Sequence, residues 1–177
     1  MSLDQHISLF RYEEKHEEKY KQQLLDFRLP AEQAEFTGLP EETLQDACED
    51  HGKMGVIIAR DNRAVGFFVL HAGEGIADFF QDYFGAVLLR AFLMDHASQG
   101  QGFAKAAMAL LPEFVRVHYP EAQQIVLAVN ERNLPAAQLY SRAGFQDHGL
   151  RRTGSKGNQL ILQYELSGAP AIPSVHG

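Results

Sequence analysis

The stretch SQGQGFAKAAM, residues 98–108, decides how the rest of the chain is interpreted. Two glycines stand two positions apart, after a glutamine and ahead of small residues. The segment before it, AVLLRAFLMD over residues 86–95, is almost continuously apolar, which is typical of a strand covered on both faces. After it, apolar residues recur at intervals of three and four over residues 103–118, which predicts a helix with one apolar stripe. The stripe consists of Phe103, Ala107, Leu110, Leu111, Phe114 and Val117.

The glycines are therefore expected at the N-terminus of a helix that follows a buried strand. Such a position binds anions, because the first backbone N–H groups of a helix have no partner within it and the helix dipole favours negative charge. A phosphate can also approach a backbone that lacks Cβ atoms. The alternative is a turn that needs glycine only for a positive φ, and a lone G-x-G does not exclude it. The spacing excludes two nucleotide-binding motifs, since G-x-x-x-x-G-K-[ST] is absent and Lys105 interrupts G-x-G-x-x-G.

The other elements follow from periodicity and turn residues. Strands are predicted over 7–12, 56–59, 65–70 and 125–130, and in the closing segments at 145–153 and 160–166. Helices are predicted over 13–27, 41–49, 103–118 and 134–144. The central order of strand, glycine-rich turn, helix, strand and helix indicates an α/β layout.

Composition limits the class of protein. A chain of 177 residues is long enough for one domain, expected over residues 1–167, with a Pro-rich tail over 168–177 that we expect to be disordered. No run is long and apolar enough for a transmembrane helix, and we expect no binding to a membrane. Cys48 is the only cysteine, which fits a cytoplasmic location. A net charge of −7 argues against nucleic acid as a partner, and the eight histidines lack metal-ligand spacing, so no metal is expected.

Two motifs in a fixed order carry a family resemblance. Residues 99–104, QGQGFA, match the pattern Q/R-x-x-G-x-G/A, and residues 133–145, NLPAAQLYSRAGF, match N-x-x-A-x-x-L-Y-x-x-x-G-F. In this order they resemble the GNAT superfamily of acyl-CoA N-acetyltransferases, specifically over 86–145 and by pattern over 54–166. The resemblance implies an α/β (α+β) fold with a mixed, mostly antiparallel sheet of about six to seven strands, flanked by helices and splayed between the fourth and fifth strands.

The resemblance also implies an enzyme, an acyltransferase that uses acetyl-CoA as co-substrate and no metal. Backbone amides of residues 101–105 would hold the CoA pyrophosphate, and the backbone of residues 92–94 would pair with the pantetheine arm. Asn133 would either hydrogen-bond the pantetheine or cap the helix that follows it. The implied binding residues are Phe92, Leu93, Met94, Gln99, Gly100, Gln101, Gly102, Phe103, Ala104, Lys105, Asn133, Ala136 and Tyr140.

Tyr140 is the implied catalytic residue. The amine would attack the thioester directly in a ternary complex, and a phenol near the sulfur can give a proton to the departing thiolate. A general base is not identified, because the position where some relatives carry a strand glutamate is Leu88. Arg90 is unusual in so apolar a run. The candidate carboxylates are Glu74, Asp78, Asp82 and Asp95, although the pattern favours a solvated loop residue at each of these positions.

The acceptor is expected to be a primary amine of a small molecule or peptide. The net charge and the acidic segment GEGIADFFQD, residues 73–82, favour a cationic acceptor. The alternative function is a non-catalytic domain that binds acyl-CoA as a sensor or interaction module. Pairing of two copies through sheet edges, giving a homodimer, is left open.

Overall fold

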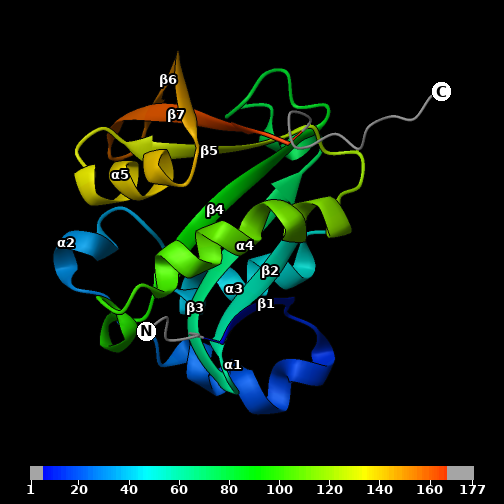
Figure 1. Ribbon diagram of the computed structural model, residues 1–177, viewed down its shortest axis with the longest axis vertical. Coiled ribbons are helices and arrows are strands. Elements are labelled where there is room, and N and C mark those ends of the chain that lie inside the picture. Colours follow the sequence, from blue (N-terminus) through cyan, green and yellow to red (C-terminus); the bar gives the residue numbers. More distant parts are fainter. Residues whose placement is uncertain (1–5, 167–177) are drawn as a thin grey trace.

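A single seven-stranded sheet lies at the centre of the computed structural model, which describes residues 6–166 (Figure 1). The strands are β1 (Ile7–Arg11), β2 (Lys53–Arg60), β3 (Arg63–Ala72), β4 (Ala86–Met94), β5 (Gln124–Asn130), β6 (Gln146–Gly154) and β7 (Gly157–Glu165). The helices are α1 (Glu17–Leu25), α2 (Ala31–Ala34), α3 (Pro40–Glu49), α4 (Phe103–His118) and α5 (Leu134–Arg142), with 3-10 turns η1 (Glu14–His16), η2 (Glu74–Ile76) and η3 (His96–Ser98).

The strand order is β1-β2-β3-β4-β5-β7-β6, and β4 and β5 are the one parallel pair of neighbours within residues 6–166. All other neighbouring strands run antiparallel. The predicted mixed, mostly antiparallel sheet flanked by helices is confirmed. The tail predicted over residues 168–177 lies outside the described residues.

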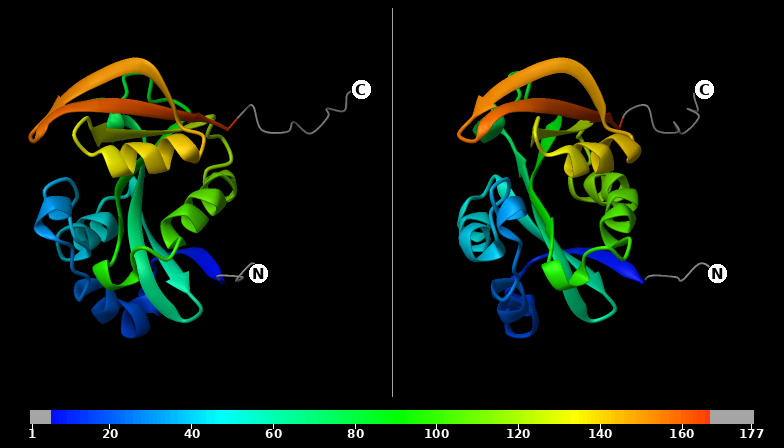
Figure 2. Two further views of the ribbon diagram at one scale, coloured as in Figure 1. Left: turned by 60° about the vertical axis from the view of Figure 1, so that its left-hand side comes forward. Right: turned by 90° about the vertical axis from the view of Figure 1, so that its left-hand side faces the viewer.

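Helices cover both faces of the sheet. Figure 2 shows α4 and α5 on one face and α1, α2 and α3 on the other. The α4 face holds the largest apolar core, in which residues of β2 to β5 alternate inward. The opposite face holds two smaller cores, one under α1 and α3 and one under the loop between β3 and β4. Within residues 6–166 no helix is long and apolar enough to cross a membrane.

Helix α4 begins at Phe103 and ends at His118, as predicted. Its N-cap, Gly102, has a φ of 83°, in the left-handed region that favours glycine. Four of the six residues of the predicted stripe are buried, but Leu110 and Val117 are 39% and 65% exposed. Seven residues fall about 20° short of two full helical turns. Positions 110 and 117 therefore rotate progressively out of the interface that begins at Phe103.

Strands β4 and β5 part halfway along their length. They pair in parallel from Ala86 opposite Gln124 to Leu89 opposite Leu127, and no further. Beyond that point β4 stays with β3, whereas β5 stays with β7 to its end at Asn130. The predicted splay between the fourth and fifth strands is thus present.

Candidate active site

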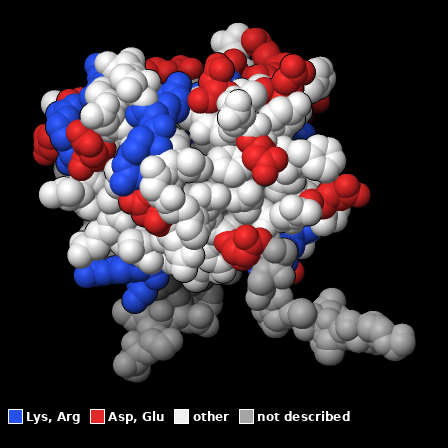
Figure 3. Space-filling model, turned by 90° about the horizontal axis from the view of Figure 1, so that it is seen from above, with Lys and Arg blue, Asp and Glu red and all other residues white. Residues whose placement is uncertain are grey.

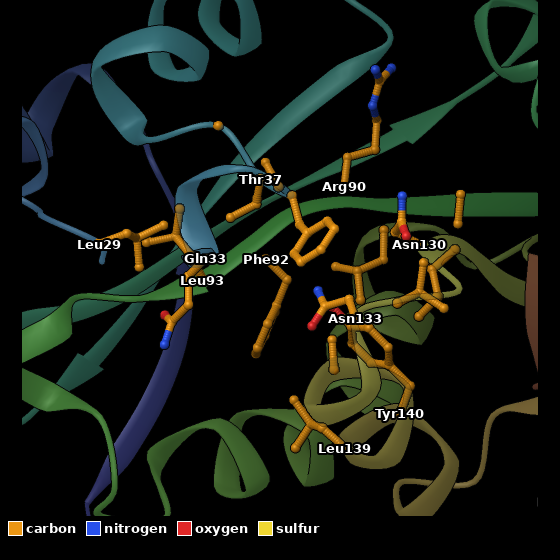
Figure 4. A pocket seen from close by; sticks show the side chains of 18 of the residues that line it. Leu29, Gln33, Thr37, Arg90, Phe92, Leu93, Asn130, Asn133, Leu139 and Tyr140 are labelled. Atoms are coloured by element: carbon orange, nitrogen blue, oxygen red, sulfur yellow. The ribbon is translucent and has the colours of Figure 1, made fainter. Parts of the chain in front are cut away.

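A cleft of about 1010 Å³ opens where β4 and β5 part. One wall comes from β4 and from the segment around α2, and the other from β5, α5 and the β6–β7 hairpin. In Figure 4, Phe92 of β4 projects into the middle of the cleft. Around it stand two groups of side chains, with Leu29, Gln33 and Thr37 on one side and Asn133, Leu139 and Tyr140 on the other.

A bulge in β4 faces this cleft. Arg90 is opposite Val69 and Leu93 is opposite Phe67, so that two residues of β4 oppose one residue of β3. The extra residue accommodates a positive φ of 51° at Ala91, which is uncommon for a residue other than glycine. Bulges re-aim a strand beside functional sites. Here β5 has left the backbone edge of β4, which can pair with a ligand apart from the Met94 carbonyl that Gln99 engages.

The glycine loop forms the end of the cleft at the start of α4. Gly100 and Gly102 have φ values of 76° and 83°. The first α4 amide with a partner along the helix is that of Ala106, which donates to the Gly102 carbonyl at 3.1 Å. A Cβ atom placed on Gly100 would meet nothing within 4 Å, so space lies beside this backbone. The loop therefore has both the amides and the room that a phosphate group requires.

Twelve of the thirteen residues implied by the sequence motifs line the cleft. The exception is Gln101, which lines a smaller hollow beside Arg60 and Arg63. Phe103 is buried in the α4 core, and Lys105 is exposed at the rim. Gln99 is held by protein groups, since its side-chain amide exchanges hydrogen bonds of 2.7 and 3.1 Å with Gln33 and also donates to the Met94 carbonyl. Gln99 thereby connects the α2 segment to the end of β4.

Tyr140 is buried among aromatic rings, with centroid distances of 6.3 Å to Phe92 and 6.0 Å to Phe145. Its hydroxyl has no hydrogen-bond partner among residues 6–166. Burial raises the pKa of this phenol well above its usual value, and the hydroxyl is protonated at neutral pH, as that of an ordinary tyrosine also is. The side chain can therefore donate a proton into the cleft.

Asn133 stands at the N-cap of α5, but its side chain makes no capping hydrogen bond. It lines the cleft half-buried, with its amide available to a ligand. Of the two roles weighed for it from the sequence, capping of α5 is not what the structure shows. The neighbouring Asn130 does bond to protein, donating to the Lys156 carbonyl at 3.0 Å and accepting from the Arg132 amide at 2.9 Å.

The loop between β3 and β4 contributes Phe79 alone to the cleft. It packs inward through Ile76 and Phe80, and its carboxylates at 74, 78 and 82 are exposed away from the cleft. Asp95 is also outside, where it accepts a hydrogen bond from the Arg28 amide at 2.9 Å. The carboxylates that do line the cleft are Glu35, Glu42 and Asp46. None of these three was singled out from the sequence.

Other lining residues were missed as well, because they come from segments distant in sequence. Thr37 has a buried hydroxyl without a hydrogen-bond partner within residues 6–166. Arg152 of β6 joins Arg90 and Phe79 at the end of the cleft remote from the glycine loop. No local pattern marks these side chains; a lone arginine in an apolar strand, at Arg90, was the one available signal.

Comparisons with known proteins agree with this geometry. The sequence model of the acetyltransferase (GNAT) family matches residues 19–145. The chain is 40% identical to the uncharacterized N-acetyltransferase YbbJ of Bacillus subtilis over 165 residues, which are 93% of this chain and 100% of that protein. It is 30% identical to a spermine/spermidine N(1)-acetyltransferase of the same organism, over 71% of this chain and 81% of the relative.

The fold also has solved counterparts. A structure of AAC(6')-Ib in complex with parmomycin and acetyl-CoA superposes with a TM-score of 0.67 at 19% identity, covering 95% of this chain and 99% of the other. At that identity the likeness concerns the fold.

Proposed function

Because the chain belongs to the GNAT family of acetyltransferases, we propose that it moves an acetyl group from acetyl-CoA to a primary amine of a small molecule or peptide. The observation that carries this proposal is the parting of β4 and β5 directly beside a glycine-initiated helix. It offers an anion site, an open backbone edge and a buried proton donor along one cleft.

The proposed binding of acetyl-CoA uses the backbone more than side chains. The free amides at residues 103–105 would hold the pyrophosphate, and this is supported by the space beside Gly100. The edge of β4 at residues 92–94 would accept the pantetheine arm as an added strand, supported by the loss of β5 from that edge. Asn133 would hydrogen-bond the same arm, since its amide is not engaged in capping α5.

Acetyl-CoA supplies the activated thioester, and the chain supplies orientation and a proton. The amine would attack the thioester directly in a ternary complex. Tyr140 would give its proton to the sulfur that leaves, a role supported by its place in the lining of the cleft beside Phe92. Leu88 is buried in the core under the β3–β4 loop, so that position supplies no base. The proton of the amine would pass to water or to a carboxylate that lines the cleft.

The direct test is mass spectrometry of an amine panel incubated with the protein and acetyl-CoA. We expect an acceptor to gain one acetyl group and CoA thiol to appear in equal amount. Cys48 is exposed and would react with the reagent that detects the CoA thiol, so the thiol measurement uses the Cys48→Ser variant. A non-catalytic acyl-CoA-binding module would bind acetyl-CoA and leave every amine unmodified.

A further inference from the structure

We propose that the acceptor amine carries an anionic group, a carboxylate or a phosphate, and that Arg90 and Arg152 bind it. The proposal rests on acetyl transfer in the cleft and names the substrate class for it. It departs from a cationic acceptor such as a polyamine, which one relative's name would favour.

Arg90 is held in place at the end of the cleft remote from the glycine loop. Its Nη1 donates to Nδ1 of His71 at 2.9 Å, and its guanidinium carbon lies 4.9 Å from the centroid of the Phe79 ring. In Figure 4 the side chain extends from β4 away from Tyr140. Within residues 6–166 it forms no ion pair with a carboxylate.

Arg152 reaches the same aromatic ring from β6. Its guanidinium carbon lies 3.9 Å from the Phe79 centroid, and its Nη1 donates to Gln159 Oε1 at 2.8 Å. In the part of the chain that is described, it has no carboxylate partner either. Two guanidinium groups thus contact the same ring. Neither of them donates a hydrogen bond to an acidic side chain within residues 6–166, although each has five N–H donors.

Two like charges this close repel each other, and burial of Arg90 adds a desolvation penalty. The carboxylate with the strongest influence on Arg90 is Asp46, which is already ion-paired with Lys53. Asp50, the other carboxylate that acts on Arg90, also lies within ion-pair distance of Lys53, at 3.8 Å, so neither acid is ion-paired with the two arginines within residues 6–166. On the face shown in Figure 3, most Lys and Arg lie on the left, interspersed with some Asp and Glu, and further Asp and Glu lie on the right.

A bound anion would supply the missing partner. Guanidinium groups bind carboxylates and phosphates through paired N–H donors, and such charge-assisted bonds are stronger than neutral ones. Thr37 lines the same cleft, and its buried hydroxyl has no hydrogen-bond partner within residues 6–166. A polyamine would instead place positive charge against Arg90 and Arg152, which disfavours it.

The test compares matched acceptors with wild-type protein. Each of several amino acids is paired with its carboxamide, and glucosamine 6-phosphate with glucosamine, with spermidine as the cationic member. We expect at least one anionic member to have a kcat/KM about 10-fold or more above its neutral partner. The amino acid and sugar phosphate arms separate carboxylate from phosphate recognition.

The variants Arg90→Gln and Arg152→Gln then separate recognition from packing. We expect each to raise KM for the anionic acceptor about 10- to 100-fold, with a much smaller change of KM for the neutral partner and no change of KM for acetyl-CoA. Arg151→Gln is the matched control, because Arg151 adjoins Arg152 but is exposed and ion-paired with Asp147 at 2.8 Å. A structural role for the arginines would lower activity with both members of a pair equally.

Equal or better turnover of neutral or cationic amines, with no change of preference in the variants, would overturn the inference and leave acetyl transfer standing. If no amine is acetylated, acetyl transfer fails instead. In that case the inference survives only if the anionic amines raise the Tm of the wild-type protein saturated with CoA and do not raise the Tm of the Arg90→Gln variant. Absence of that shift overturns it too.

Discussion

Arg90 of β4 and His71 of β3 are joined by a hydrogen bond of 2.9 Å between Nη1 and Nδ1. A guanidinium can only donate, so Nδ1 of His71 accepts and the ring carries its proton on Nε2. Burial lowers the pKa of His71, and the charges of Arg90 and Lys53 lower it further, against a smaller opposing effect of Asp50 and Asp46. The folded state therefore favours the neutral form of the His71 imidazole.

This pair predicts a loss of stability on mild acidification. Unfolded His71 takes up a proton near its ordinary pKa of 6.5, whereas the folded ring resists until a lower pH. The unfolded state thus binds more protons, and the stability present above about pH 6.5 declines as the pH falls through the folded pKa. In His71→Asn, whose amide oxygen can still accept from Arg90, urea unfolding should lose less stability between pH 7.5 and 5.5. The exposed His148→Asn is the control, and an equal loss in wild type and His71→Asn would contradict the prediction.

The glycine loop predicts a loss of acetyl-CoA binding in Gly100→Glu. Acetyl-CoA at about 100 times its Kd should stabilise the wild-type fold by about 2.7 kcal/mol. The variant should lose this effect, because its side chain and charge enter the phosphate site. Gly149→Glu is a close control, since Gly149 also has a positive φ, of 94°, and open space at its Cβ position, but lies on β6 outside the cleft. Without acetyl-CoA the two variants should lose similar stability, because both place a side chain at a positive φ. A rise in Tm with acetyl-CoA as large in Gly100→Glu as in wild type would refute the phosphate site.

We predict that no side chain is tolerated at Gly66, where β3 meets the bulged end of β4. A Cβ there would lie 2.8 Å from the Leu93 carbonyl oxygen and 2.6 Å from the Met94 sulfur. Gly66→Ala should reduce the free energy of unfolding by about 1–3 kcal/mol, as overpacking does. A Cβ on Gly55 would meet the ring of Phe67 at 3.0 Å and Tyr12 Cβ at an ordinary 3.7 Å, so Gly55→Ala should lose less free energy of unfolding in the same urea titration. A neutral Gly66→Ala would mean that β4 can shift freely.

The local parts of the fold were predictable from sequence because their causes are local. The bounds of α4 follow from its glycines and its apolar spacing, and the β2–β3 turn at Asp61 follows from its turn residues. Helix α2 was not predicted, since it has four residues and is held by contacts across the cleft. These contacts are the Gln33 bonds to Gln99 and the ion pair of Glu35 with Arg132 at 3.0 Å.

The candidate site divides in the same way. Its glycine loop and its Asn133–Tyr140 helix are continuous motifs, and the residues carried over from them line one cleft with the exception of Gln101. The end of the cleft proposed to bind the acceptor is assembled from Thr37, Phe79 and Arg152, which come from distant segments that only the tertiary fold brings together. The acidic segment at residues 73–82 illustrates the limit, because composition cannot tell which side of a loop faces a cleft.

Tyr140 donating a proton to the departing thiolate is the central claim, and Tyr140→Phe tests it most directly. The variant keeps the ring that packs against Phe92 and Phe145 and removes the hydroxyl alone. The measurement is kcat with a saturating acceptor, beside the Kd of acetyl-CoA. Tyr164→Phe is the matched control, since its ring also packs on Phe145, at 5.5 Å, but stands on β7 outside the cleft.

We expect Tyr140→Phe to lower kcat about 100-fold or more with an unchanged Kd, and Tyr164→Phe to leave both unchanged. Wild-type kcat in Tyr140→Phe, under conditions where acetyl transfer limits the rate, would contradict the claim and make Tyr140 a packing residue.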